Sequence, residues 1–308
     1  MESIKVFAPA TVANVVCGFD ILGFAVNEPG DELIMEMTNK PGVNIISIEG
    51  DEGKLPLDPA KNTVSATVIS LLRYLGKEGI GLNIKLKKMM PMGSGLGSSS
   101  ASAVAGLFAA NELLGKPLSK LELLPFAMEG EALACGHGHA DNVAPALFGG
   151  FTLIKSYEPL EVISLPVPKL YCALLYPHVD VPTRDARQII RSKVLLKDAV
   201  TQWGNIAGLI SALYTQDYDL LGRSMKDVII EPIRSILIPE FDRMKEMALG
   251  NGALGFGISG SGPTVFSLFK SADAAQKSLQ EMKQMLAQQG IESNIYLSEI
   301  NKKGPIVL

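Results

Sequence analysis

The residues best suited to chemistry lie at 91–102, PMGSGLGSSSAS, a stretch with three glycines and five serine hydroxyls. Glycine accepts positive φ and has no side chain, so such a turn brings backbone N–H groups close to a ligand. Residues 82–87 before it alternate as a half-buried strand does, and apolar residues recur at helical spacing after 101. The stretch therefore predicts a phosphate-binding loop that opens a helix, whose N-terminal N–H groups attract an anion.

Two common nucleotide-binding patterns do not explain this loop. The chain has no GxxxxGK[ST] sequence, so the lysine and hydroxyl of a P-loop ATPase are missing. Gly255, Gly257 and Gly260 match GxGxxG, but residues 264–269 read as a strand where a dinucleotide fold needs a helix. A flexible Gly/Ser surface turn is the remaining alternative, and the strand and helix predicted on either side argue against it.

Composition limits the class of protein. The 308 residues exceed the usual size of one core, and a Pro-containing stretch at 164–168 suggests two domains, 1–165 and 166–308. The net charge of −4 argues against nucleic acid or an anionic membrane as partner. Three widely spaced cysteines form no zinc or redox pattern, and no basic segment precedes the apolar N-terminus. We expect a cytoplasmic protein.

Short strands and amphipathic helices interleave along the chain, which predicts an α+β fold. Ser119 and Glu122 form a capping-box pattern, so a helix is expected to begin there. Strands are expected at 33–38, 43–48, 82–87, 151–154, 170–175, 253–258, 264–269 and 294–297, and further helices near 64–75, 101–114, 183–190, 197–213, 239–249 and 272–289.

Two other segments hold polar residues that structure alone does not require. Asn14 and Asp20 stand within an otherwise apolar stretch at 8–23, where buried polar groups need partners. Residues 136–145 also concentrate polar side chains, and Glu129 and Glu131 precede them on a predicted helix.

A metal site can be considered at the second of these segments. His137, His139 and a nearby carboxylate form only a loose zinc pattern, because glycine flanks His137 on both sides. A hard divalent ion held by a carboxylate and by phosphate oxygens fits better.

The motifs resemble those of the GHMP small-molecule kinases. Residues 91–102 look like the phosphate loop of that family, 9–23 like its N-terminal substrate motif, and 257–264 like its C-terminal glycine-rich motif. Within the family, residues 9–20 and 139–145 resemble the members that act on L-homoserine. The motifs occur in the family's order and span nearly the whole chain.

The resemblance implies a two-lobed architecture, with an N-terminal lobe like ribosomal protein S5 and a C-terminal ferredoxin-like lobe. ATP and the acceptor would lie between them, with Mg²⁺ as cofactor. The implied reaction phosphorylates the hydroxyl of L-homoserine to give O-phospho-L-homoserine and ADP, a step of threonine biosynthesis, and a homodimer is compatible with it. The alternatives are a kinase for another alcohol, such as mevalonate or a sugar, and a ligand sensor without turnover.

The family's functional residues map onto matching positions. Ser99 and Glu131 are implied as Mg²⁺ ligands, and Glu129 is a rival for the latter. The implied ATP-binding residues are Asn62, Pro91, Met92, Gly93, Ser94, Gly95, Leu96, Gly97, Ser98, Ser99, Ser100, Ala101, Gly260 and Ser261. The implied acceptor contacts are Asn14, Asp20, His139, Asn142, Thr183, Arg187 and Arg234.

The chemistry of homoserine makes these residue types sensible. Its ammonium pairs with a carboxylate such as Asp20, and its carboxylate with the guanidinium groups of Arg187 and Arg234. Without the resemblance, the simpler interpretation is structural: Arg187 would lie on a solvated helix face, and Arg234 would cap a helix end.

Asp141 and Asn142 both stand near the position of the family's catalytic base. Phosphoryl transfer depends mainly on positioning and charge neutralisation. Direct transfer with Asn142 orienting the acceptor is therefore favoured, and a role for Asp141 as base stays open.

Overall fold

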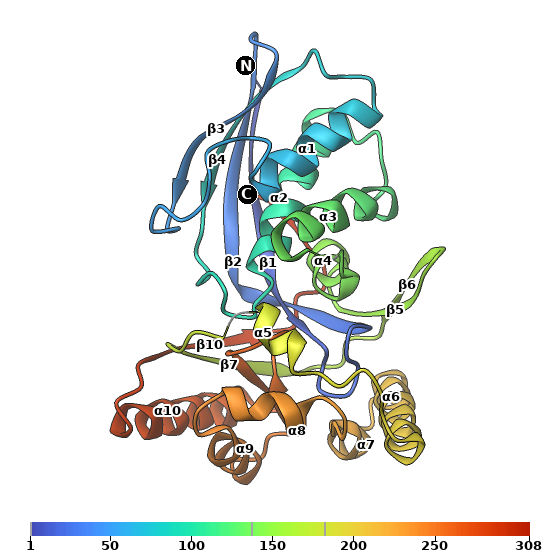
Figure 1. Ribbon diagram of the computed structural model, residues 1–308, viewed down its shortest axis with the longest axis vertical. Coiled ribbons are helices and arrows are strands. Elements are labelled where there is room, and N and C mark those ends of the chain that lie inside the picture. The colour runs from blue at the N-terminus through green and yellow to red at the C-terminus, as the bar shows by residue number, and fades with distance from the viewer. Residues whose placement is uncertain (1, 137, 182) are drawn as a thin grey trace.

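The computed structural model describes residues 2–136, 138–181 and 183–308, and they form two lobes of mixed helix and sheet (Figure 1). The strands and helices interleave along the chain, as an α+β fold requires. The described residues include no helix with the length and apolar character needed to span a bilayer.

The first lobe is built on a seven-stranded sheet. Its central order is β11-β1-β2-β4-β3, while β5 pairs with β2 and with β6. Every pairing is antiparallel except that of β3 with β4. The strands are β1 (Ser3–Ala13), β2 (Leu22–Thr38), β3 (Gly42–Glu49), β4 (Gly81–Lys87), β5 (Phe151–Tyr157), β6 (Leu160–Leu165) and β11 (Ile306–Val307).

Four helices cover one face of this sheet: α1 (Thr63–Tyr74), α2 (Ser98–Leu113), α3 (Lys120–Cys135) and α4 (Ala140–Phe148) (Figure 1). Helix α2 packs against β1 and β2 and against the other three helices, so it is buried almost all round. Small residues make this possible, because six of its 16 positions are alanine or glycine, in the pattern AxAxAGxxAA over residues 101–110. The glycine-rich loop that precedes α2 is thus attached to a helix that is packed on most sides.

The second lobe has a four-stranded antiparallel sheet in the order β10-β7-β9-β8. Helices α9 and α10 pack on one face (Figure 1), and the other face joins the core of the first lobe, where the rings of Phe24 and Phe266 lie 5.7 Å apart. The remaining elements are β7 (Tyr171–Pro177), α5 (Thr183–Gln188), α6 (Leu196–Thr215), α7 (Tyr218–Ser224), α8 (Glu231–Arg234), a 3₁₀ turn (Ser235–Leu237), α9 (Phe241–Gly250), β8 (Gly255–Ile258), β9 (Val265–Phe269), α10 (Ala272–Gln288) and β10 (Ser293–Glu299).

The expected strands and helices are present, but β1, β6, β11, α4, α7 and α8 were not predicted. In β1, residues 8–13 are buried on both faces, so the sequence shows no alternation there. The C-terminal segment returns from the second lobe to the first. Ile300 forms a β-bridge with Val26, and β11 pairs with β1. The last residues therefore join the sheet of the first lobe, whereas the sequence division counts all of 166–308 as one unit.

Candidate active site

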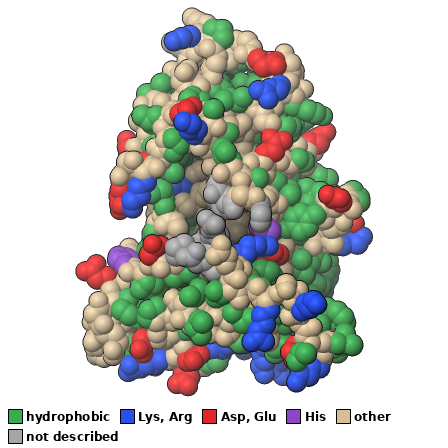
Figure 2. Space-filling view, in the orientation of Figure 1, with side chains coloured by type: hydrophobic (Ala, Val, Ile, Leu, Met, Phe, Trp, Pro, Cys, Tyr) green, Lys and Arg blue, Asp and Glu red, His purple; other side chains and the backbone are tan. Residues whose placement is uncertain are grey.

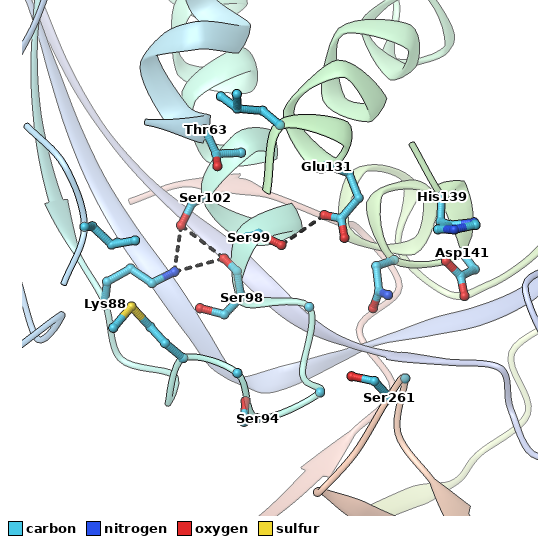
Figure 3. A pocket seen from close by; sticks show the side chains of 18 of the residues that line it. Thr63, Lys88, Ser94, Ser98, Ser99, Ser102, Glu131, His139, Asp141 and Ser261 are labelled. Carbon is cyan, nitrogen blue, oxygen red and sulfur yellow. Dashed lines mark hydrogen bonds between the residues drawn. The ribbon is translucent and has the colours of Figure 1, made fainter. Parts of the chain in front are cut away.

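The loop between β4 and α2 turns through three glycines in the left-handed region, with φ of 69° at Gly93, 83° at Gly95 and 66° at Gly97. Gly97 is the N-cap of α2 and has no side chain with which to cap the first N–H groups of the helix. The loop and the helix terminus border the same cleft (Figure 3). Such a terminus favours an anionic ligand, as the sequence predicts.

A turn at 259–264 of the second lobe holds this loop from the other side. Ser259 Oγ donates to the carbonyl of Gly95 at 2.7 Å, and the N–H of Thr264 donates to the carbonyl of Ser94 at 3.1 Å. The turn joins β8 to β9, so the GxGxxG match is followed by a strand and is not a dinucleotide motif.

The cleft between the lobes encloses a cavity of about 410 Å³, and Figure 2 shows the surface hollowed there. This volume is in the range of small-molecule sites. Most of the predicted site residues line it: Asn14, Asp20, Asn62, Met92, Gly93, Ser94, Gly95, Gly97, Ser98, Ser99, Glu131, His139, Asp141, Asn142, Arg187, Arg234, Gly260 and Ser261.

A few predicted residues lie elsewhere. Leu96, Ser100 and Ala101 are fully buried below the loop, and Pro91 does not line the cleft. Thr183 begins α5, but its side chain lies outside the described part of the chain. Asn62 borders the cleft as the N-cap of α1: its Oδ1 accepts the N–H of Val64.

Glu131 reaches from α3 to the first turn of α2. Its Oε2 accepts hydrogen bonds from Ser99 Oγ at 3.0 Å and Ser100 Oγ at 2.7 Å, and the residue is buried (Figure 3). Glu129 is exposed on the same helix and accepts instead from Ser70 of α1. Of the two rival glutamates, Glu131 is therefore the one that borders the loop.

Asp20 is held at one end of the cleft by hydrogen bonds to its backbone N–H and carbonyl. Its N–H donates to Asn14 Oδ1 at 3.0 Å, and its carbonyl accepts from the hydroxyl of Tyr157 at 3.0 Å. Asn14 Nδ2 in turn donates to the carbonyl of Gly260 in the second lobe at 2.8 Å. Asn14, Val15, Val16 and Asp20 all have positive φ, a conformation that costs energy in non-glycine residues and often marks functional sites.

Two arginines border the same end. Arg187 Nη2 lies 2.8 Å from Asp20 Oδ2, so the two residues form an ion pair. The buried guanidinium of Arg234 donates to the carbonyls of Ala186 and Gly260, both at 3.0 Å. Both guanidinium groups also lie over the ring of Phe19. Arg187 thus faces the cleft, and Arg234 bonds to two other segments of the chain.

Asn142 and Asp141 occupy the first turn of α4. Thr11 Oγ1 donates to Asn142 Oδ1 at 2.7 Å, which leaves the amide NH₂ of Asn142 as the group that can donate to a ligand. Asp141 is buried. Burial first, and then the carboxylates of Asp20 and Glu131, raise its pKa to about 7, against the opposing effect of Arg187.

The structure adds Lys88 and Ser102 to the lining of the cleft, and Asp31 behind them. A signal for Lys88 was present, because Leu82, Ile84, Leu86 and Lys88 share one phase of the strand alternation. A charged residue in phase with three apolar ones is expected on the buried face.

No cluster of three or more His, Cys, Asp or Glu side chains suited to a metal occurs among the residues that the structure describes. His137, one member of the zinc pattern considered from the sequence, lies outside those residues. Ser99 and Glu131 nevertheless supply hydroxyl and carboxylate oxygens beside the loop, which are the ligand types that Mg²⁺ takes together with phosphate oxygens.

Comparisons with known proteins agree with this geometry. The family model described as GHMP kinases N terminal domain matches residues 62–150, and that of GHMP kinases C terminal matches 209–288. A homoserine kinase of Chlorobium phaeovibrioides is 48% identical over the whole of both chains. The crystal structure of homoserine kinase from Cytophaga hutchinsonii is 56% identical, with a TM-score of 0.97 over 100% of this chain and 98% of that one.

More distant structures share the fold alone. The mevalonate kinase of L. major, in complex with R-mevalonate, has a TM-score of 0.73 at 17% identity and covers 97% of this chain and 96% of that one.

Proposed function

The chain belongs to the GHMP kinases, and we infer that it is a homoserine kinase, which uses ATP to phosphorylate the hydroxyl of L-homoserine. The observation that carries the acceptor class is the meeting of Asp20, Arg187 and Arg234 at one end of the cleft. A site for an amino acid needs a negative group for the ammonium and a positive group for the carboxylate. Mevalonate has a carboxylate but no ammonium, and a neutral sugar has neither group. Full-length likeness to homoserine kinases supports the same acceptor.

The ATP phosphates bind at the loop. Backbone N–H groups of residues 93–100 and the positive end of α2 face them, and the turn with Gly260 and Ser261 closes the cleft from the second lobe. Asn62 lies at the adenine end, near the start of α1.

Ser99 and Glu131 would hold Mg²⁺ together with the phosphate oxygens. A bound Mg²⁺ would neutralise the negative charge that develops on the transferred phosphoryl group. Because Glu131 accepts from two serine hydroxyls of α2, its carboxylate is already turned toward the loop.

Binding of homoserine replaces the ion pair between Asp20 and Arg187 with contacts to both charged ends of the acceptor. In the structure Asp20 and Arg187 form an ion pair. The ammonium of homoserine pairs with Asp20, and its carboxylate with Arg187 and Arg234, while Asn14 and His139 border the same end. A zwitterion is therefore accommodated without leaving a charge of the site unpaired.

Asn142 orients the acceptor hydroxyl, and transfer is direct. Thr11 fixes the orientation of the Asn142 amide, whose NH₂ group can donate to the acceptor hydroxyl. A carboxamide is too weak a base to take the hydroxyl proton. The loose transition state of phosphoryl transfer makes a strong base unnecessary.

Substrate turnover tests the proposal. Release of ADP is measured with L-homoserine, mevalonate, galactose and shikimate, each at the same concentration. Homoserine alone is expected to support turnover. Turnover only with another alcohol would identify a different GHMP kinase, and turnover with none of the four would indicate a ligand sensor.

Asp141→Asn should stabilise the protein above pH 7 and lower kcat by less than about tenfold. The pKa of Asp141 is raised from 3.8 to about 7, so the wild-type fold binds a proton between these pH values that the unfolded chain has lost. The contribution of Asp141 to the free energy of unfolding therefore falls as pH rises from about 4 to about 7, by up to about 1.4 kcal/mol per pH unit, and levels off above pH 7.

The check is urea unfolding of both proteins at pH 4 and pH 8, with kcat measured at pH 8. The stability gain of Asp141→Asn should appear at pH 8 and vanish at pH 4. A loss of kcat of about 100-fold or more would instead make Asp141 the general base.

Gly97→Ala should weaken ADP binding by about tenfold or more. A Cβ on Gly97 would lie 2.1 Å from Thr11 Oγ1 and 2.9 Å from Asn142 Oδ1, so this pair and the start of α2 must move. Gly93→Ala is the matched control, because Gly93 also has positive φ but a Cβ there meets no atom within 4 Å. Calorimetric titration with ADP compares them, and equal affinities would mean that the contact at Gly97 does not matter.

A further inference from the structure

A buried ion pair lies beside the phosphate loop and has no part in the mechanism above. The side chain of Lys88, just after β4, is 2% exposed, and that of Asp31, on β2, is fully buried. The ammonium of Lys88 donates to the Asp31 carboxylate. Lys88 and Ser102 both line the cleft at its phosphate end (Figure 3).

Asp31 also binds the entry of the loop. Its Oδ1 accepts the N–H of Met89 at 2.9 Å and that of Met90 at 3.3 Å. The two residues lead directly from β4 into the glycine-rich turn.

Lys88 binds the exit of the loop. Its ammonium donates to the carbonyl of Ser98 at 2.9 Å and to Ser102 Oγ at 2.7 Å, both in the first turns of α2 (Figure 3). With Asp31, these acceptors use all three ammonium protons. Asp31, Lys88 and Ser102, here called the loop clamp, therefore connect the two ends of the loop.

Stability alone gives little reason for such a cluster. Removing two charges from water costs several kcal/mol, and apolar residues of similar volume often stabilise a fold as well or better. A buried lysine with three acceptors is useful where geometry must be fixed. Here the fixed element is the Ser98 carbonyl, at the end of α2 whose N–H groups border the cleft.

We propose that Lys88 is a positioning residue for nucleotide binding: through the loop clamp it sets the spacing between residues 89–90 and the first turn of α2. The backbone N–H groups of the loop and of α2 then converge on the phosphates. The proposal rests on the proposed function only for the nature of the ligand, a nucleoside polyphosphate, and not for the acceptor.

The test compares nucleotides with and without phosphates. Lys88→Met should weaken ADP binding by about tenfold, as expected for loss of hydrogen bonds made by a charged group, and leave adenosine binding within about twofold. KM for ATP should rise in parallel, while KM for homoserine stays within about twofold. Lys87→Met is the matched control, since Lys87 is the adjacent, exposed residue of β4, and it should change none of these values.

A second variant guards against misfolding, because Lys88→Met leaves Asp31 charged and unpaired. Lys88→Met combined with Asp31→Asn buries no charge, and the Asn oxygen can still accept from Met89 and Met90. Thermal unfolding by circular dichroism verifies the fold, and ADP binding should again fall while adenosine binding persists.

Two results would overturn the proposal: wild-type ADP affinity in the folded double variant, or equal losses for ADP and adenosine, which would mean that the substitution damages the whole nucleotide site and not phosphate binding in particular. ADP binding by the wild type without homoserine turnover would overturn only the acceptor assignment. Absence of ADP binding by the wild type would overturn both.

Discussion

Glu131→Gln is expected to lower kcat by about 100-fold or more, while Glu129→Gln leaves kcat unchanged. The amide keeps the size of the side chain and can still accept from Ser99 and Ser100, but it loses the negative charge that a hard divalent ion requires. Glu129 is exposed two residues away on α3 and faces Ser70, so the control changes the same charge on the same helix.

The measurement is kcat as a function of Mg²⁺ concentration at saturating ATP and homoserine, with thermal unfolding of each variant in parallel. Glu131→Gln should need far more Mg²⁺ for half-maximal activity and should unfold at a temperature close to that of wild type. Normal Mg²⁺ dependence in Glu131→Gln, combined with its loss in Glu129→Gln, would assign the metal to the other carboxylate.

Local sequence signals predicted the elements that carry the phosphate site. The capping box at Ser119 and Glu122 is present at the start of α3, where each residue bonds the backbone of the other. The glycines of the loop take positive φ. These features depend on residues within a few positions of one another, which is why the sequence contains them.

Contacts between distant segments could not be predicted in the same way. Thr11 bonds Asn142 across 131 positions, and Asn14 bonds Gly260 across 246. Such pairs follow from how the lobes pack, and no local pattern encodes them. The resemblance named Asn14 and Asn142 as ligand contacts, but it did not reveal that one supports the second lobe and the other is oriented by β1.

The ion pair of Asp20 with Arg187 illustrates the same limit. The sequence assigns Asp20 to the ammonium of homoserine and Arg187 to its carboxylate. The two residues are therefore expected to have different partners. In the structure they pair with each other, because opposite charges within reach of one another in a partly enclosed cleft lower the energy by pairing. In the proposed binding mode the acceptor replaces this pair, and the charges of the acceptor offset the cost of breaking it.

Arg187→Met and Arg234→Met are each expected to lower kcat/KM for homoserine by roughly 30-fold or more, because losing one partner of a desolvated ion pair typically costs about 2 to 5 kcal/mol. Arg191→Met, an exposed arginine of the same segment, is the control and should have no effect. Arg187→Lys should rescue only in part, since an ammonium cannot reproduce a planar guanidinium fork.

Homoserine methyl ester separates loss of carboxylate recognition from general damage to the site. The ester keeps the ammonium and the hydroxyl but has no carboxylate charge, so wild type should use it poorly. Arg187→Met has already lost that interaction, and the ratio of kcat/KM for homoserine to that for the ester should shrink toward one. Arg234→Met should show the same trend on a lower overall rate, because Arg234 also holds the carbonyls of Ala186 and Gly260. An unchanged ratio in both variants would mean that neither arginine reads the carboxylate, and the acceptor pocket would have to be sought elsewhere in the cleft.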